Sequence, residues 1–224
     1  MKNVLTVAAI AAFAGAANAN VVVSEIHGST AGTDAEYIEI YNDGTAGNAP
    51  IDISNWSLAF YDSDTTDADF GTIDFQLDIP AGTVLAPGDI FLAVSPQARS
   101  VFPGIPLSTF GIGNDSIEND SYTAVFRDAS SNILEILFTV DPGEGAAQAN
   151  IDGNPVVPTT TFGPDGTFLA PGYYRTDAAG AFTLTDFGNG APNNPLVANY
   201  PAVPAPGAIA LAAIAGLASR RRRA

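Results

Sequence analysis

Four aspartates lie close together between positions 62 and 69, and they form the densest group of potential ligands in the sequence. They are Asp62, Asp64, Asp67 and Asp69. Carboxylate oxygens on a loop are the ligands that Ca²⁺ prefers, and such a group repels itself without a cation. The spacing is not that of an EF-hand, because Asp67 stands where that loop requires glycine. A calcium site is therefore the hypothesis for this group, although a solvated, solubilising surface loop is the favoured interpretation.

A second acidic stretch, NDSIEND at 114–120, has the same character. Its three acids, Asp115, Glu118 and Asp120, also supply hard oxygen ligands on a short segment. A solvated, solubilising surface is again the alternative to a calcium site. The solvated surface is the favoured interpretation for this stretch too.

Residues for acid–base or nucleophilic catalysis are scarce. His27 is the only histidine, the chain has no cysteine, and no G-x-S-x-G motif is present. A Ser–His–Asp site needs a carboxylate that orients the imidazole, and nothing in the spacing selects Asp34 or Glu36 for that role. We expect His27 to be a partly exposed loop residue. The sequence predicts no catalytic residue and therefore no enzyme.

The elements that position these residues are short strands. Between residues 20 and 200 almost nothing repeats with helical periodicity, while 22 glycines and 16 prolines mark frequent turns. The runs rich in β-branched and aromatic residues are 21–26, 36–41, 56–60, 72–77, 90–94, 122–127, 133–139 and 180–185. This pattern predicts an all-β, antiparallel sandwich in one domain. We expect aliphatic side chains and Trp56 in its core, with Glu, Asp and Thr on the solvent face.

The N-terminus has the layout of a secretory signal peptide. Lys2 precedes an apolar stretch over residues 4–15, and the small residues Ala17 and Ala19 form a cleavage site. The apolar stretch is too short to span a bilayer. We expect signal peptidase to remove residues 1–19, a signal helix, so that the mature chain begins at Asn20.

The C-terminus, residues 203–224, combines a turn motif, an apolar stretch and a basic cluster. The motif contains Val203, Pro204, Pro206 and Gly207, and the cluster consists of Arg220, Arg221, Arg222 and Arg223. About 13 apolar residues form a helix of roughly 20 Å, shorter than the hydrocarbon core of about 30 Å. The helix therefore predicts a transient association with the inner membrane, with the arginines on the cytoplasmic side. A plain short tail anchor is the alternative.

This three-part tail resembles the PEP-CTERM sorting signal, although Ala205 stands where that family usually has Glu. The resemblance implies cleavage near residues 204–207 by an exosortase and transfer to the outer cell surface or extracellular matrix.

The domain between the two ends is strongly acidic. It contains only three arginines but all 24 acidic residues. So acidic a domain repels nucleic acid, which is therefore excluded as a partner.

Four ordered motifs between residues 21 and 94 resemble the lamin tail domain. They are VVSEI at 22–26, EYIEIYN at 36–42, IDISNWSL at 51–58 and IPAGTVLAPGD at 79–89. The third is similar to the family's D-L-S-G-W-x-L strand and the fourth to its I-P-x-G-T-x-L-x-P-G turn. The resemblance implies an immunoglobulin-like β-sandwich over residues 20–200, with a core match over 21–140 and a decorated second half over 141–200. It implies no activity.

The leading functional hypothesis is a non-enzymatic structural or interaction protein of the cell envelope or matrix, whose partner is an extracellular polysaccharide or a surface protein. The first alternative is a calcium-dependent carbohydrate-binding module, which needs exposed aromatics near the acidic loops, at Tyr61, Phe70 or Tyr122. A hydrolase of surface glycans is the least favoured, because it needs two carboxyl groups about 5 to 9.5 Å apart in a cleft.

Overall fold

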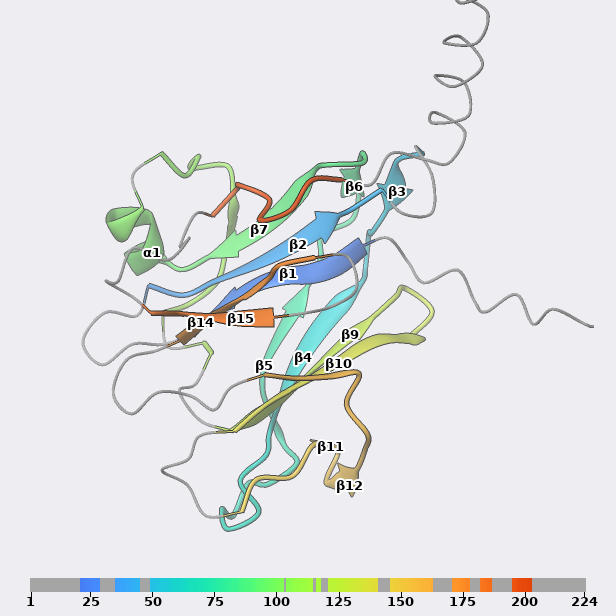
Figure 1. Cartoon of the computed structure of the whole chain (residues 1–224), viewed down its shortest axis with the longest axis vertical. Helices are drawn as coiled ribbons and strands as arrows, with labels where there is room; N and C mark the ends of the chain where they lie inside the picture. Colours follow the sequence, from blue (N-terminus) through green and yellow to red (C-terminus); the bar gives the residue numbers. More distant parts are fainter. Residues whose placement is uncertain are drawn as a thin grey trace, which may run out of the picture.

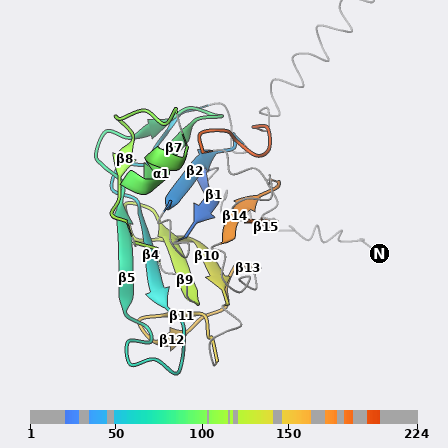
Figure 2. The same ribbon diagram turned by 90° about the vertical axis from the view of Figure 1, so that its left-hand side faces the viewer.

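Two β-sheets pack face to face in the structure (Figures 1 and 2). The computed structural model describes residues 21–28, 35–44, 49–102, 104–114, 116–117, 121–140, 146–162, 171–177, 182–186 and 195–202. Within these residues all but one short helix, α1 (Pro96–Val101), is strand, turn or loop. The expected all-β, immunoglobulin-like sandwich is confirmed, whereas the expected terminal helices lie outside the described residues.

Six strands form the first sheet and five form the second. The first runs β15 (Phe182–Asp186), β14 (Pro171–Arg175), β1 (Val21–His27), β2 (Tyr37–Asn42), β7 (Ile90–Val94), β8 (Phe110–Gly111). The second runs β13 (Thr160–Phe162), β10 (Ile133–Thr139), β9 (Tyr122–Arg127), β4 (Ser57–Asp62), β5 (Ile73–Asp78). Neighbours are antiparallel except the pairs β7–β8 and β10–β13, which are parallel. Two short ribbons complete the fold: β3 (Ile51–Asp52) with β6 (Val84–Leu85), and β11 (Asn150–Ile151) with β12 (Asn154–Pro155).

The core lies between the two sheets and is built from alternate residues of each strand. Ile38 and Ile40 of β2 face Leu58 and Phe60 of β4 in one buried cluster. Trp56 belongs to this cluster, with 8% of its surface exposed and its ring 5.5 Å from that of Phe126. The prediction that Trp56 fills the core is confirmed.

A β-bulge in β1 sets which of its side chains reach the core. The pairing with β2 shifts register between Val23 and Glu25, so Ser24 is an extra residue. Val23 on one side of the bulge and Ile26 on the other both join the core cluster. Glu25 therefore lies on the opposite, outer face, where its pairing partner is Glu39 of β2.

That outer face is covered rather than solvated. The helix α1 packs on one part of it, where Ala98 contacts Tyr37 and Leu92. Residues 195–202, called the strap below, lie along another part, in red in Figure 1, where Tyr200 packs on Val22 and Tyr41. The prediction that acidic residues occupy a solvent face is therefore wrong for β1 and β2, because two further segments cover this sheet.

The acidic residues affected are Glu25 and Glu39, both of which are fully buried. Glu36, just before β2, is also fully buried, but its carboxylate lies against residues 116–117, whose amides it accepts bonds from. By contrast, the expected alternation holds in β5, an edge strand of the other sheet. There Asp74 and Asp78 are exposed, and Leu77 between them is buried.

The helix α1 begins at a local signal in the sequence. Ser95 is its N-cap, with its hydroxyl accepting a hydrogen bond from Ala98 N at 3.1 Å, and Pro96 occupies the first turn. The same hydroxyl accepts from Glu36 N at 3.1 Å, which ties the start of the helix to the start of β2. The helix is thereby fixed over the first sheet.

An ion pair joins the two sheets at the β1 bulge. Arg175 of β14 bonds Glu135 of β10, and only 3% and 14% of the two side chains are exposed. Arg175 Nε also donates to Val23 O at 3.2 Å, and Val23 N donates to Glu135 Oε2 at 3.0 Å. The pair thus satisfies both backbone groups of a bulge residue. Arg175 lies in the second half of the chain, which therefore completes the sandwich.

Candidate interaction site

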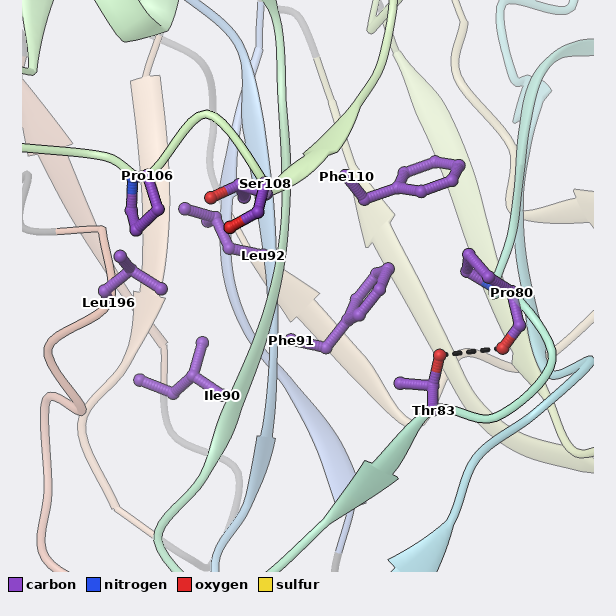
Figure 3. Close-up of a pocket in the computed structure, with 10 residues that line it drawn as sticks. Pro80, Thr83, Ile90, Phe91, Leu92, Pro106, Ser108, Phe110 and Leu196 are labelled. Atoms are coloured by element: carbon purple, nitrogen blue, oxygen red, sulfur yellow. Dashed lines mark hydrogen bonds between the residues drawn. The ribbon is translucent and has the colours of Figure 1, made fainter.

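A groove of about 360 Å³ lies beside β7 and β8, at one edge of the first sheet (Figure 3). Its lining combines apolar and hydroxyl side chains from four segments of the chain. These residues are Pro80, Thr83, Ile90, Phe91, Leu92, Pro106, Ser108, Thr109, Phe110 and Leu196. We call this site the β7–β8 groove.

The chemistry of the groove favours binding over catalysis. The rings of Phe91 and Phe110 lie 5.9 Å apart, inclined by 39°, and form an aromatic wall. Thr83 adds a hydroxyl, which donates to Pro80 O at 2.7 Å and keeps its lone pairs for a ligand. None of the lining residues that the structure describes carries a carboxylate, imidazole, thiol or amine. Such a site fits a ligand with an apolar face and peripheral hydroxyl or amide groups.

One arginine holds the outer rim of the groove in place. Arg99, in the last turn of α1, donates to Pro106 O at 2.7 Å and to Thr109 O at 2.6 Å. These bonds fix the loop that leads into β8, whose Phe110 pairs with Ala93 of β7. Sequence reasoning missed the groove and Arg99, because the lining residues are far apart in the chain and match no motif.

The predicted calcium cluster lies elsewhere, in the loop between β4 and β5. Ligand oxygens of Asp62, Asp67 and Asp69 lie within 4.8 Å of one another. Asp64 is not part of this group, because its carboxylate accepts bonds from the amide and hydroxyl of Thr66, both at 2.8 Å. The structure thus brings together three of the four predicted ligands.

Burial, and to a smaller extent crowding of negative charge, raises the pKa values of two aspartates around this loop. Burial, more than the negative charges of Asp69 and Asp67, raises the pKa of Asp62. Partial burial, together with the charges of Asp62 and Asp69, raises the pKa of Asp74 to about 6. The loop is therefore a site where a bound cation would relieve repulsion.

A buried asparagine holds the acidic loop against the rest of the fold. Asn150 donates through Nδ2 to Asp62 O at 2.8 Å and to Ser63 Oγ at 3.2 Å. At the far end of the loop, Gly71 packs directly on the backbone of Gly153. Asn150 was not singled out in the sequence, although the turn formed by Asp152 and Gly153 beside it is a recognisable signal.

The second acidic stretch is attached to the first sheet by a buried glutamate. Glu36 accepts bonds from Ser116 N at 2.9 Å and Ile117 N at 3.0 Å. Its acids Asp115, Glu118 and Asp120 lie outside the described residues. The hypothesis of a calcium site there stays a prediction.

His27 is a buried strand residue rather than a partly exposed loop residue, so that expectation is wrong. It ends β1 on the covered outer face, with its ring stacked on Tyr37 at 5.2 Å. Burial lowers the pKa of His27 to about 4, so the imidazole is neutral at physiological pH. It does not line the β7–β8 groove.

The aromatics expected to be exposed near the acidic loops are mostly buried. Tyr61 and Tyr122 expose only 3% and 7% of their surface, so the expectation is wrong for these two residues. Phe70 is half-buried and remains available to a ligand. The reason is that Tyr122 packs in the core between the two sheets, whereas Tyr61 packs with Val125 in a smaller cluster against which Ile151 lies.

The predicted processing residues lie outside the described residues. They comprise Ala17 and Ala19 at the N-terminus, and Val203, Pro204, Pro206, Gly207, Arg220, Arg221, Arg222 and Arg223 at the C-terminus. Among the residues that the structure does describe, no helix is long and apolar enough to cross a membrane. Signal cleavage and surface sorting stay predictions.

Comparison with known proteins agrees with the fold. The family model of the lamin tail domain matches residues 14–140, which contain every strand from β1 to β10. No curated protein matches the chain. Since the matched region spans more than half of the chain and contains most strands of both sheets, this protein belongs to the lamin tail domain family.

Proposed function

We propose that this protein is an exported, surface-sorted interaction protein of the cell envelope or extracellular matrix, without enzymatic activity. The β7–β8 groove carries the proposal, because it combines an aromatic wall with hydroxyl groups and lacks ionisable side chains. The lamin tail domain supports it as an immunoglobulin-like fold that is typically not catalytic. The partner is an extracellular polysaccharide or a surface protein that places an apolar face on Phe91 and Phe110.

The partner and its site can be tested together. A glycan array and an array of envelope proteins, probed with the full chain, are expected to give ligands whose affinity falls at least tenfold in Phe110→Ala, because an aromatic contact is lost. Val157→Ala is the matched control, since Val157 is 87% exposed and does not line the groove. Melting temperatures would show that both variants are folded. Unchanged binding by Phe110→Ala would exclude the groove as the site.

Export and sorting form the second part of the proposal and rest on the two ends of the sequence. We expect signal peptidase to cleave after Ala19 and an exosortase-type enzyme to cleave near residues 204–207. Mass spectrometry of the protein isolated from its native cells is expected to show Asn20 as the first residue and no C-terminal arginine cluster. Detection of Arg220 to Arg223 in the surface-exposed protein would contradict this processing.

A calcium-dependent carbohydrate-binding module is the second candidate, and the grouping of Asp62, Asp67 and Asp69 favours it. Millimolar Ca²⁺ is then expected to raise the melting temperature by several degrees, because a cation that binds only the folded state stabilises it. Asp67→Asn/Asp69→Asn should lose this shift and, without Ca²⁺, should melt above the wild type since repulsion is relieved. Asp78→Asn, on the exposed face of β5, is the control. If Ca²⁺ leaves the wild-type melting temperature unchanged, the site does not exist.

A further inference from the structure

Two fully buried glutamates face each other on the outer side of the first sheet. Glu25 of β1 and Glu39 of β2 are pairing partners on adjacent strands, placed there by the β1 bulge. This carboxyl pair takes no part in the β7–β8 groove, which it does not line. It is also no catalytic pair for glycan hydrolysis, because both side chains are closed off from solvent by the strap.

Each carboxyl group of the pair has one hydrogen-bond donor on the sheet and one on the strap. On the sheet, Tyr37 OH donates to Glu25 Oε1, and Ser24 Oγ donates to Glu39 Oε1 at 2.8 Å. On the strap, Asn199 Nδ2 donates to Glu25 Oε2 at 3.2 Å, and Leu196 N donates to Glu39 Oε2 at 3.1 Å. All four donors are neutral groups, so the pair accepts hydrogen bonds but no compensating positive charge from them.

Among the residues that the structure describes, the groups around the pair do not supply that charge either. The titratable side chains on the elements packed around it are His27 on β1, Glu36, Tyr37, Tyr41 and Asp43 on or beside β2, Tyr174 on β14 and Tyr200 on the strap. Strand β7 adds only the apolar Ile90, Leu92 and Val94. The arginines of the flanking elements bond elsewhere, Arg99 to the groove rim and Arg175 to Glu135.

Burial without a cation raises the pKa of both acids. The pKa of Glu25 is raised to about 8, mainly by desolvation. The hydrogen bond from Tyr37 lowers this pKa, and the charge of Glu39 raises it further. Desolvation likewise raises the pKa of Glu39 to about 7. With the strap open to water, both values would return towards the ordinary 4.5. Strap seating is therefore fully favoured below pH 4.5 and is weakened as the pH rises through 7 and 8.

The strap also contacts Tyr41 of β2, and the backbone of one of its residues, Leu196, is strained. Tyr200 lies edge-on to Tyr41 with ring centres 5.3 Å apart, and Tyr41 OH donates to Tyr200 O at 3.2 Å. Leu196 has a φ of 72°, a conformation that costs a leucine energy and that its bond to Glu39 helps to hold. Leu196 also lines the β7–β8 groove, so the groove is complete only while the strap is seated.

We propose that Glu25 and Glu39 act as a proton-controlled latch on the strap, which closes over the protonated pair and opens when both groups ionise. Opening removes Leu196 from the β7–β8 groove, and ligand binding there is then weakened. This last consequence rests on the proposed function of the groove, whereas the latch itself does not. His27, with a pKa of about 4, stays neutral between pH 6 and 9 and takes no part in that range.

The chain has no cysteine, so one introduced thiol can report on the strap. Ala198→Cys places it on the strap, where Ala198 packs against Tyr200 and Tyr41, and Val157→Cys gives an exposed reference. We define the protection of position 198 as the reaction rate of the Val157→Cys variant with a thiol reagent divided by that of the Ala198→Cys variant. This ratio cancels the pH dependence that comes from ionisation of the thiol itself. We expect the protection of position 198 to fall at least tenfold between pH 6 and pH 9.

Neutral glutamines separate the latch from general loosening of the fold. In Glu25→Gln/Glu39→Gln, protection of the thiol at position 198 is expected to stay high across the same pH range. Glu39→Gln alone, a milder change, should shift the pH at which half of the protection of position 198 is lost, whereas Asp78→Asn should leave that pH unchanged. Protection that is unchanged between pH 6 and 9 in the parent, or lost equally in the glutamine variants, overturns the latch. No ligand is needed, so a failure of the groove as a binding site leaves this result intact.

Discussion

Replacing Arg175 with alanine is expected to lower the free energy of unfolding, as measured by denaturant unfolding at pH 7, by about 3 to 5 kcal/mol. The loss is large because Glu135 would keep a buried negative charge without its partner. Burial already raises the pKa of Glu135, and the charge of Arg175 is the main effect that opposes it. Val23 O would lose its donor, and Phe182 would lose the guanidinium that lies 4.8 Å from its ring.

A variant that keeps hydrogen bonding without charge is the control for this ion pair. Arg175→Gln/Glu135→Gln leaves an acceptor for Val23 N and no buried charge, so we expect it to lose about 2 kcal/mol or less. If Arg175→Ala costs under about 1 kcal/mol, the ion pair does not hold the two sheets together.

Gly71→Ala is expected to lower the free energy of unfolding by about 3 kcal/mol or more, again by denaturant unfolding. A Cβ at position 71 would lie 2.3 Å from Gly153 N and 2.4 Å from its Cα, and these are backbone atoms that cannot turn aside. Gly71 also has a φ of 85°, which alanine rarely adopts. The substitution should push the acidic loop away from residues 150–153.

Gly82→Ala separates the backbone effect from the clash. Gly82 has nearly the same φ, 83°, but a Cβ there meets nothing within 4 Å. We expect it to cost about 1 kcal/mol, the price of the left-handed conformation alone. Equal losses in the two variants would show that the contact between Gly71 and Gly153 is unimportant.

The longer strands up to residue 139 could be predicted because local signals agree with the tertiary fold. The runs 90–94, 122–127 and 133–139 coincide with β7, β9 and β10. Trp56 was placed correctly in the core because a large aromatic beside Ile53 and Leu58 has no other favourable environment. Short strands such as β8 and β13 were missed, because two or three residues are too few to show an alternation of apolar and polar side chains.

The covered outer face could not be predicted from alternation alone. Glu25 and Glu39 alternate with aliphatic residues just as Asp74 and Asp78 do, yet only the first two are buried. The difference arises from the strap, whose contacts join residues 157 and 174 positions apart. The extra residue in β1, Ser24, likewise leaves no mark in the sequence, because bulges depend on the partner strand.

The candidate sites, like the strands, could be predicted only where their residues are close together in the sequence. The group of aspartates at 62–69 was visible because its members are neighbours in sequence, and only the orientation of Asp64 needed the structure. Calcium binding there stays a prediction. The β7–β8 groove was invisible because Phe91, Phe110 and Leu196 come together only through folding.

Strand β14, which lies between β1 and β15 in the first sheet, is outside the region that the family model matches. That region ends at residue 140, before β14 and its Arg175. In a chain shortened to that boundary, β1 would become an edge strand with a row of unpaired amides and carbonyls, next to a buried Glu135 without its cation. Such an edge invites pairing with other chains and aggregation. The unit that folds is therefore longer than the unit that the family model recognises.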